Sequence, residues 1–295
     1  MSKPFAFDIV WSFASPLVFS KIYNFGTLNL AGKPYNTDKY WEIYNNTDEV
    51  QYADGLFLGE AYGSAVTASA YTDFDEKDVV YLQRVVKLPG TGKDFPIEPG
   101  KSIVIAQNAK NHIVAEVITK TVDLSKANIE CYVEGAPASM FSDNADVPNV
   151  TEIFGAGTYL AKFGAGQGCC PVLFSIKQDE FDAIETVLVP GSDAYGAQYA
   201  SYCKPLPAKY VIDAVDMARR SYADRKGKHM PATLDADWAW IDQGTAAVRM
   251  GAYVAADGRI VLSDTNNSKV DFYEMLPKEG QTDGSHLTPG VYYVE

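Results

Sequence analysis

The sequence predicts a mainly β protein, and three observations support this prediction. Aromatic side chains are abundant, with 19 Tyr and 14 Phe in 295 residues, and such residues favour strands over helices. Gly and Pro are spread along the whole chain, as expected where many short strands are joined by turns. Apolar and polar residues alternate in several short segments, which is typical of strands with one face in a core. The chain is also long enough to bury a sizeable core.

The first predicted strand is LVFSKIY at 17–23, where alternation indicates a half-buried strand. A Gly- and Asn-rich loop leads to the second, at 39–45, which contains YWEIYN. Alternation places Trp41 and Ile43 on one side of this strand and Glu42 on the other. We expect the polar corner NNTD that follows to fold through side-chain hydrogen bonds to the backbone, without any chemical role.

Further strands show similar patterns. Gly55 tolerates the backbone at the start of a strand at 54–59, and a Pro-Gly turn leads directly into SIVIA at 101–106. Alternation places six apolar side chains against one shared core: Trp41, Ile43, Leu56, Leu58, Ile103 and Ile105. Other predicted strands cover 79–87, 129–133, 158–163, 171–176, 185–189, 209–217, 246–254 and 259–263.

Only the segment 208–225 offers a helical alternative. Val211, Ile212 and Val215 fit helical spacing, whereas YVIDAV also suits a strand. Periodicity alone does not decide between the two, so both remain open.

Charge and hydropathy restrict the function classes. The chain has 25 Lys and Arg against 38 Asp and Glu, a formal charge of −13. It therefore lacks the basic surface of nucleic-acid-binding proteins and the polybasic clusters that bind anionic lipid. No apolar run approaches the roughly 18 residues of a transmembrane segment. Pro4, Asp8 and Ser12 interrupt the N-terminal segment, which does not resemble a signal peptide. Either the protein is cytoplasmic or this sequence begins after a targeting segment.

The cysteines and histidines show no metal-binding spacing. Cys131 and Cys203 stand alone and Cys169 is adjacent to Cys170, unlike the spaced pairs of zinc sites. The three His are far apart in sequence. No cofactor is therefore expected. In an exported protein the four Cys allow three pairings, and the sequence does not choose among them.

The acidic run TDFDEKD offers one candidate cation site. Its carboxylates, Asp73, Asp75, Glu76 and Asp78, could gather a hard cation such as Ca²⁺. The spacing lacks the Gly and terminal Glu of a calcium-binding loop, so a solvated surface loop is the alternative.

Three tyrosines are the candidate ligand-binding residues. Tyr195, Tyr199 and Tyr202 follow one another at spacings of four and three, which would place their rings on one face of a helix. Aromatic rings are good binding anchors, and Asp193 could add a polar contact. The alternative is that the three rings pin this segment onto the rest of the protein.

Recognisable catalytic motifs are missing from the sequence. No Ser lies in a G-x-S-x-G elbow, and GAGQG at 164–168 lacks the Lys and hydroxyl of a phosphate-binding loop. The pairs Asp235/Asp237 and Asp213/Asp216 offer carboxylates for acid–base chemistry, but the sequence gives no separation between them. We therefore expect a protein that is not an enzyme.

The order of several motifs resembles that of the lamin-tail domain. They are EIYNNTD, YADGLFL, IEPGKSIVIA and, between Val248 and Gly290, VRM, DTNNSKVDFYEM and TPG. The segments EIYNNTDEVQYADGL, PGKSIVIAQNAKNH, VDLSKANIE and PATLDADW more closely resemble a Bacteroidota family of unknown function built on that domain. The resemblance runs from about Leu17 to Gly290 and departs at 59–80 and 137–207.

This resemblance implies an immunoglobulin-like β-sandwich of lamin-tail type, elaborated by long insertions. A single domain would span 1–295, with core strands at about 17–135 and 208–290 and an insertion at about 137–207. It also implies an exported lipoprotein at the cell surface or outer membrane, with its anchor or signal segment absent from this sequence.

The implied function is that of a non-enzymatic cell-surface binding or accessory protein. Its partner would be an outer-membrane TonB-dependent nutrient transporter or another surface protein. A structural surface or filament subunit is one alternative, and a glycan or phosphoester hydrolase is another. The ligand, the anchoring mode, the disulfide state and the oligomeric state remain open.

Overall fold

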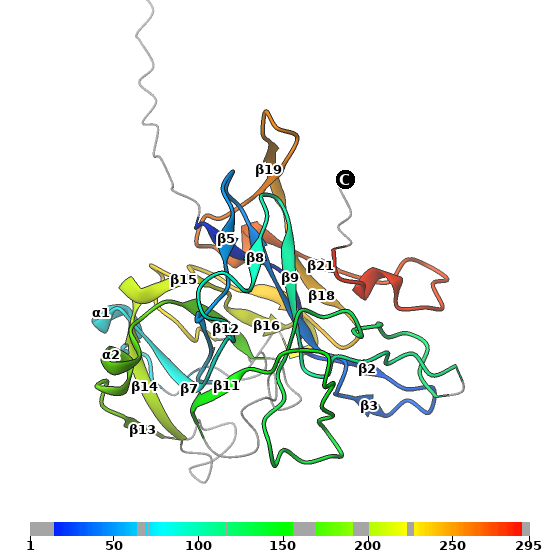
Figure 1. Cartoon of the computed structure of the whole chain (residues 1–295), viewed down its shortest axis with the longest axis horizontal. Coiled ribbons are helices and arrows are strands. Elements are labelled where there is room, and N and C mark those ends of the chain that lie inside the picture. Colours follow the sequence, from blue (N-terminus) through cyan, green and yellow to red (C-terminus); the bar gives the residue numbers. More distant parts are fainter. Residues whose placement is uncertain are drawn as a thin grey trace, which may run out of the picture.

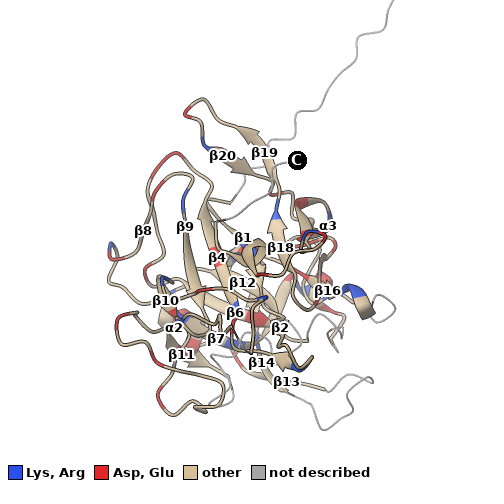
Figure 2. Cartoon of the chain, turned by 90° about the vertical axis from the view of Figure 1, so that its right-hand side faces the viewer, with Lys and Arg blue, Asp and Glu red and all other residues tan. Residues whose placement is uncertain are grey.

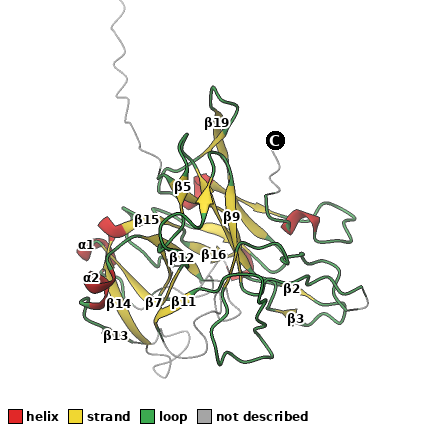
Figure 3. Cartoon of the chain, viewed as in Figure 1, coloured by secondary structure: helices red, strands yellow, loops and turns green. Residues whose placement is uncertain are grey.

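The computed structural model describes residues 15–63, 69, 71–115, 117–155, 169–190, 201–222 and 227–290. Strands predominate among these residues (Figure 3). Helical structure within them is limited to short 3-10 turns and three short helices, α1 (Phe74–Lys77), α2 (Gln178–Asp182) and α3 (Ser268–Asp271). The expected mainly β fold is confirmed.

The first principal sheet joins six strands of the described chain in the order β10-β9-β4-β1-β18-β21. The first strand, β1, pairs antiparallel with β4 on one side and with β18 on the other, so it lies in the interior of the sheet. The strands are β1 (Leu17–Tyr23), β4 (Tyr40–Asn45), β9 (Ser102–Ala106), β10 (Ile129–Glu130), β18 (Ala246–Arg249) and β21 (Phe272–Met275).

The second principal sheet has the order β13-β14-β7-β6-β12-β15, with β11 also paired to β7. β12 lies between β6 and β15, and it pairs with β6 along its whole length. The described strands of the segment 137–207, which was expected as an insertion, are therefore part of this sheet. The strands are β6 (Phe57–Ala61), β7 (Val79–Lys87), β11 (Thr151–Phe154), β12 (Cys170–Phe174), β13 (Val187–Val189), β14 (Ser201–Pro207) and β15 (Val211–Ala214).

Four two-stranded ribbons complete the described sheet structure. Three are antiparallel, and the β16–β17 pair is parallel. They are β2 (Thr27–Leu28) with β3 (Pro34–Tyr35), β5 (Gln51–Tyr52) with β8 (Pro96–Ile97), β16 (Met217–Arg219) with β17 (Ala239–Ile241), and β19 (Gly251–Val254) with β20 (Ile260–Leu262).

Most predicted strands are present with small shifts in their ends. Those at 17–23 and 79–87 match β1 and β7 in full. The described part of 208–225, residues 208–222, forms a 3-10 turn, β15, β16 and a second turn, so the strand interpretation was right there. The single strand predicted at 246–254 is wrong. The chain leaves the first sheet after Arg249, which is anchored in the core, and β19 belongs to a separate ribbon. The predicted strand at 158–163 lies outside the described residues.

The main core lies between the two principal sheets. Buried side chains from β1, β4 and β9 of the first sheet and from β6, β7 and β12 of the second form one contiguous apolar cluster. The expected shared core is confirmed, because it contains Trp41, Ile43, Leu58, Ile103 and Ile105, with Leu56 packed against it.

The prediction that β1 and β4 are half-buried was wrong, because every residue of both strands is buried. A second apolar cluster covers the other face of the first sheet. It combines Tyr23 and Tyr40 from these strands with loop residues such as Val122, Leu124 and Leu287. The polar residues of the two strands are therefore enclosed and need internal partners.

Lys21 and Glu42 find those partners in the C-terminal segment. Lys21 Nζ donates to the carbonyl oxygens of His286 at 2.8 Å and Thr288 at 2.9 Å. Glu42 accepts from the Gly290 amide at 3.0 Å and from Ser102 Oγ at 2.5 Å. Burial lowers the pKa of Lys21 to about 8, although Glu42 opposes that change. The two strands thus hold the segment 286–290 against the first sheet.

Arg249 at the end of β18 is the centre of a buried ionic network. Its Nη2 donates to both oxygens of Asp213, at 2.8 and 2.6 Å, and its Nε donates to the Phe19 carbonyl at 2.8 Å. The guanidinium also lies 3.4 Å from Asp264 Oδ1 and 4.0 Å from Asp271 Oδ2. Asp213 in turn accepts the Phe19 amide at 2.6 Å. One cation therefore connects β1, β15, β18 and the segment that contains α3.

Replacing Ile105 tests the assignment of the core face. Ile105 is fully buried, so Ile105→Ala should lower the free energy of unfolding by about 2–5 kcal/mol and Ile105→Val by about 0.5–1.5 kcal/mol. Chemical denaturation measures both values. A loss well below 1 kcal/mol for Ile105→Ala would contradict this packing.

Replacing Arg249 tests the ionic network. Arg249→Met leaves nearby carboxylates buried without their cation, so we expect a loss of about 3–5 kcal/mol in the free energy of unfolding. Arg249→Lys keeps the charge but replaces three donor nitrogens, which bond Phe19, Ser263 and Asp213, with one ammonium nitrogen, so it should lose less. If both variants unfold at the wild-type denaturant concentration, the network does not stabilise the fold.

Candidate functional site

Most carboxylates of the acidic segment 73–78 form hydrogen bonds or ion pairs with other groups of the protein. Asp73 Oδ1 accepts from the Tyr81 hydroxyl at 2.8 Å, and its Oδ2 lies 2.7 Å from Lys77 Nζ. Asp75 accepts the Ala232 amide at 2.6 Å. These bonds link α1 and the residue before it to β7 and to the segment that contains Ala232.

The last residue of this run, Asp78, also bonds a neighbouring segment. Asp78 accepts from Thr233 Oγ1 at 2.6 Å and has a left-handed backbone with φ 50°. Within the described residues, the run does not bring three metal-ligating atoms together, and Glu76 is exposed. The calcium-binding hypothesis for Asp73, Asp75, Glu76 and Asp78 stays a prediction.

Of the four candidate ligand-binding residues, the structure describes Tyr202, whereas Asp193, Tyr195 and Tyr199 lie outside the described residues. Tyr202 belongs to strand β14, so the helical face does not extend to it. Its side chain is 65% exposed and its strand partner Leu188 is 51% exposed. The Tyr202 ring is therefore accessible to water near one end of the second sheet and does not pin that segment to the core.

The structure separates the carboxylate pairs that the sequence suggested for acid–base chemistry. Asp213 bonds Arg249, whereas Asp216 bonds His229. Asp235 is buried and accepts the amides of Asp216 at 2.7 Å and Ser268 at 2.8 Å. Burial raises the pKa of Asp235 to about 7. Asp237 lies nearer the surface, where its Oδ2 is 2.9 Å from Lys269 Nζ.

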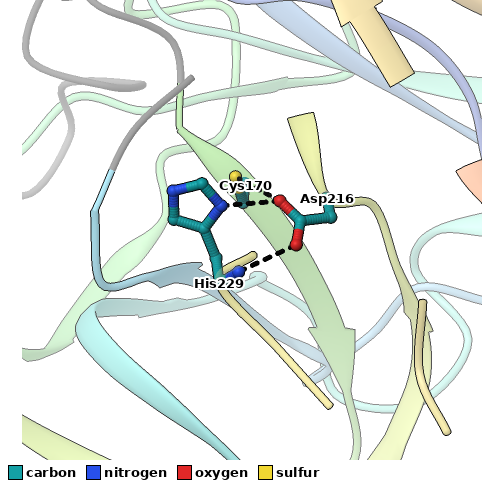
Figure 4. A group of neighbouring side chains, drawn as sticks. All are labelled: Cys170, Asp216 and His229. Atoms are coloured by element: carbon teal, nitrogen blue, oxygen red, sulfur yellow. Dashed lines mark hydrogen bonds and ion pairs between the residues drawn. The ribbon is translucent and has the colours of Figure 1, made fainter. Parts of the chain in front are cut away.

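Sequence reasoning missed a buried cluster of Cys170, Asp216 and His229 (Figure 4). Cys170 is the first residue of β12, Asp216 lies in the link between β15 and β16, and His229 follows the described segment 227–228. The ligating atoms of the three side chains all lie within 4.8 Å of one another. The residues are 46 and 13 positions apart in sequence, so only the sheet topology brings them together.

One carboxylate oxygen contacts both other side chains of this cluster. Asp216 Oδ1 lies 2.6 Å from His229 Nδ1 and 3.6 Å from Cys170 Sγ, and Asp216 Oδ2 accepts the His229 amide at 2.8 Å. In a nucleophilic triad the imidazole stands between the nucleophile and the carboxylate. Here the three groups instead converge, and all are buried. This geometry favours a cation site over a nucleophile.

The electrostatics of the cluster reflect its enclosure. Burial raises the pKa of the Cys170 thiol to about 11, although His229 opposes that change. Burial alone would lower the pKa of His229, but Cys170 and Asp216 together raise it well above its ordinary value. At neutral pH and without a metal, the Cys170 thiol is therefore neutral.

A surface pocket of about 350 Å³ lies beside β3 and the segment 138–141, and Tyr35 and Lys110 contribute to its lining. The hydroxyl of Tyr35 lies 2.9 Å from Nδ1 of the buried His112, whose Nε2 lies 3.1 Å from the Asn108 carbonyl oxygen. The carbonyl requires an N–H donor at Nε2, so in the neutral imidazole Nδ1 accepts from the Tyr35 hydroxyl. Burial lowers the pKa of His112 to about 4.

His112 should make the protein less stable in mild acid. Its pKa lies below the value of about 6.5 in an unfolded chain, so between pH 6.5 and pH 4 the unfolded state binds more protons and stability falls as the pH falls. From pH 7 to pH 5 the contribution of this residue is about 2 kcal/mol. Denaturant unfolding of His112→Gln at both pH values should show a smaller pH dependence by that amount. An unchanged pH dependence would contradict the assignment.

The β19–β20 hairpin projects from the body of the protein (Figure 1). Between Met250 and Leu262 the only charged residues are Asp257 and Arg259, and the ribbon in Figure 2 is accordingly uncharged except near its tip. All four residues of β19 are exposed, including Tyr253 at 62% and Val254 at 68%. The hairpin therefore presents an apolar surface to water.

The corner after β4 fixes the base of this hairpin. Asn46 donates from Nδ2 to the Leu262 carbonyl at 3.1 Å and accepts the Leu262 amide at 2.7 Å. Tyr44 donates its hydroxyl to the Ile260 carbonyl at 2.7 Å, and Arg259 donates to the Asn46 carbonyl at 2.8 Å. The corner expected to be purely structural thus positions an exposed element.

Fold and surface together define a mainly β protein of two packed sheets with a projecting apolar hairpin. Within the described segments, no helix has the length and apolar character needed to cross a bilayer. The chain belongs to the family described as "Protein of unknown function (DUF4876)", whose profile matches residues 98–278.

The crystal structure of a DUF4876 family protein from Bacteroides thetaiotaomicron VPI-5482, at 2.50 Å resolution, is similar to this chain. The sequence identity is 25% and the TM-score is 0.66, over 88% of this chain and 70% of that chain. No curated protein matches the chain. A Bacteroidota family of unknown function is thus confirmed, and the lamin-tail relationship stays a prediction.

Proposed function

We propose that this protein is a non-enzymatic binding protein of the cell surface that captures a partner protein on the β19–β20 hairpin. The observation behind the proposal is the exposed apolar surface of that hairpin, in which Tyr253 and Val254 are both more than half exposed. Apolar side chains gathered in this way on a soluble protein commonly mark an interaction site.

The fixed base of the hairpin supports this proposal. Asn46 and Tyr44 donate hydrogen bonds to the hairpin backbone, and Arg259 of the hairpin donates in return to the Asn46 carbonyl. Val18 and Tyr44 pack against Leu262 of the hairpin in a small apolar cluster. A binding element that is already ordered loses less conformational entropy on association. The structure thus orders an apolar surface that contributes little to its own core.

The open edge of β19 indicates how a partner would bind. Among the described strands, β19 pairs with β20 alone. A strand of the partner could add to this edge through backbone hydrogen bonds, while Tyr253 and Val254 supply side-chain contacts. The resemblance in sequence suggests an outer-membrane TonB-dependent nutrient transporter as the partner and an exported, lipid-anchored setting for this chain.

The burial and bonding of the carboxylates suggested for acid–base chemistry support a role without catalysis. Asp213, Asp216 and Asp235 are buried and bonded to protein groups, which leaves them poorly placed to meet a substrate. A filament subunit remains the second candidate function, because the same apolar edge could pair with another copy of this chain.

The double variant Tyr253→Ser/Val254→Thr tests the proposal. We expect it to reduce co-purification of the transporter with the tagged full-length chain from Bacteroidota outer membranes by at least about tenfold, because exposed aromatic anchors dominate binding energies. The yield of transporter is measured by quantitative mass spectrometry. The melting temperature should change little, since both side chains point into solvent.

The matched control is Leu30→Ser/Val117→Thr, which removes two similarly exposed apolar side chains outside the hairpin. It should co-purify the transporter at the wild-type level. Equal yields from wild type and both variants would rule out the hairpin as the binding surface. Concentration-dependent polymers of the wild type that are lost in the hairpin variant would favour the filament function.

A further inference from the structure

We propose that Cys170, Asp216 and His229 form a binding site for one divalent transition-metal cation of the zinc type. The site is separate from the proposed binding hairpin. It provides one thiol sulfur, one imidazole nitrogen and one carboxylate oxygen, all from buried residues and all within 4.8 Å.

The donor set identifies the class of cation. Thiolate and imidazole ligands suit Zn²⁺ and chemically similar ions, whereas Ca²⁺ and Mg²⁺ require oxygen ligands. Three protein donors also match the ligand count of zinc centres whose fourth position is taken by water. This donor set therefore favours a zinc-type ion over Ca²⁺.

The distances are close to those that such an ion needs. With metal–ligand bonds of about 2.0–2.3 Å, the ligand atoms of a tetrahedral centre are about 3.3–3.7 Å apart. Cys170 Sγ and Asp216 Oδ1 are already 3.6 Å apart. His229 Nδ1 and Asp216 Oδ1 are 2.6 Å apart, so this pair must separate by roughly 0.7–1 Å when a cation replaces the proton between them.

The charges of the three ligands are compatible with a buried divalent cation. A thiolate and a carboxylate together carry two negative charges, which a divalent cation neutralises while the imidazole stays neutral. A buried ion is tolerated when the surrounding ligands compensate its charge in this way. The occupied site would thus carry no net charge into the interior.

Outer hydrogen bonds already orient the central ligand. Asp216 Oδ2 accepts the His229 amide at 2.8 Å, and Asp216 Oδ1 accepts the Met217 amide at 2.9 Å. Asp235 fixes the backbone at the same place by accepting the Asp216 amide at 2.7 Å. Bonds of this kind hold metal ligands in position, and Cys170 lies on an interior strand of the second sheet.

Cobalt binding by the full-length chain tests the site directly. Protein purified under reducing conditions and treated with a chelator should bind one equivalent of Co²⁺, with a thiolate-to-cobalt charge-transfer band and the intense visible bands of tetrahedral Co²⁺. Zn²⁺ should then displace the colour. At about 100 times the dissociation constant, Zn²⁺ should raise the melting temperature by about 4 °C.

The variants separate this site from other metal binding. Cys170→Ser should abolish the charge-transfer band, and His229→Gln should reduce the affinity at least tenfold. Cys203→Ser alters another buried thiol outside the cluster and should keep the wild-type spectrum. If wild type shows no thiolate band, or if Cys170→Ser binds Co²⁺ as wild type does, the proposal is wrong. The wild-type spectrum decides the matter even if a variant fails to fold.

Discussion

The buried ion pair between Arg249 and Asp213 is the interaction on which the described structure most depends. The Arg249 guanidinium lies where β1, β15, β18 and the segment around α3 meet, and its main partner, Asp213, belongs to the opposite sheet. Asp213 also holds the Phe19 amide, and Arg249 holds the Phe19 carbonyl. The ion pair thereby connects the two sheets at one edge of the apolar core. A buried charge of this kind adds little net stability, but its geometry accepts only one arrangement of the groups around it.

The first sheet is enclosed on both of its faces. The second sheet covers one face, and loops with the C-terminal segment cover the other. Polar residues on β1 and β4 therefore do not point to water. Lys21 and Glu42 instead bind backbone groups of the last described residues. Hydrogen bonding inside the protein replaces the solvation that these side chains would have at a surface.

Much of this fold could be predicted from the sequence, because local patterns determine strands. Alternation placed Trp41, Ile43 and Ile105 in one core, and a Pro-Gly turn indicated where β9 begins. Burial of Glu42 could not be predicted, since nothing local reveals which loops cover the second face. The break after Arg249 was missed for the same reason: the residue that ends β18 is held by partners distant in sequence.

The candidate sites show a similar limit. The acidic segment suggested a cation site because its carboxylates are close in sequence, yet hydrogen bonds to neighbouring groups occupy Asp73, Asp75 and Asp78. Cys170, Asp216 and His229 have no recognisable spacing, and only the pairing of β12 with β15 and the loop after β16 bring them together. The prediction of one strand at 246–254 merged β18 with β19, so the separation of the hairpin from the first sheet was not foreseen.

The interior position of β1 in the first sheet has a consequence for biosynthesis. One neighbour of β1, the strand β4, follows closely in sequence, but the other, β18, lies more than two hundred residues downstream, as the pairing of Lys21 with Val248 shows. A nascent chain can therefore pair one edge of its first strand early, while the other edge stays open until β18 has been synthesised. Long-range pairings of this kind slow folding and leave strand edges open to wrong partners. During translation this chain should therefore depend on chaperones that shield β1 until nearly the whole sequence has emerged.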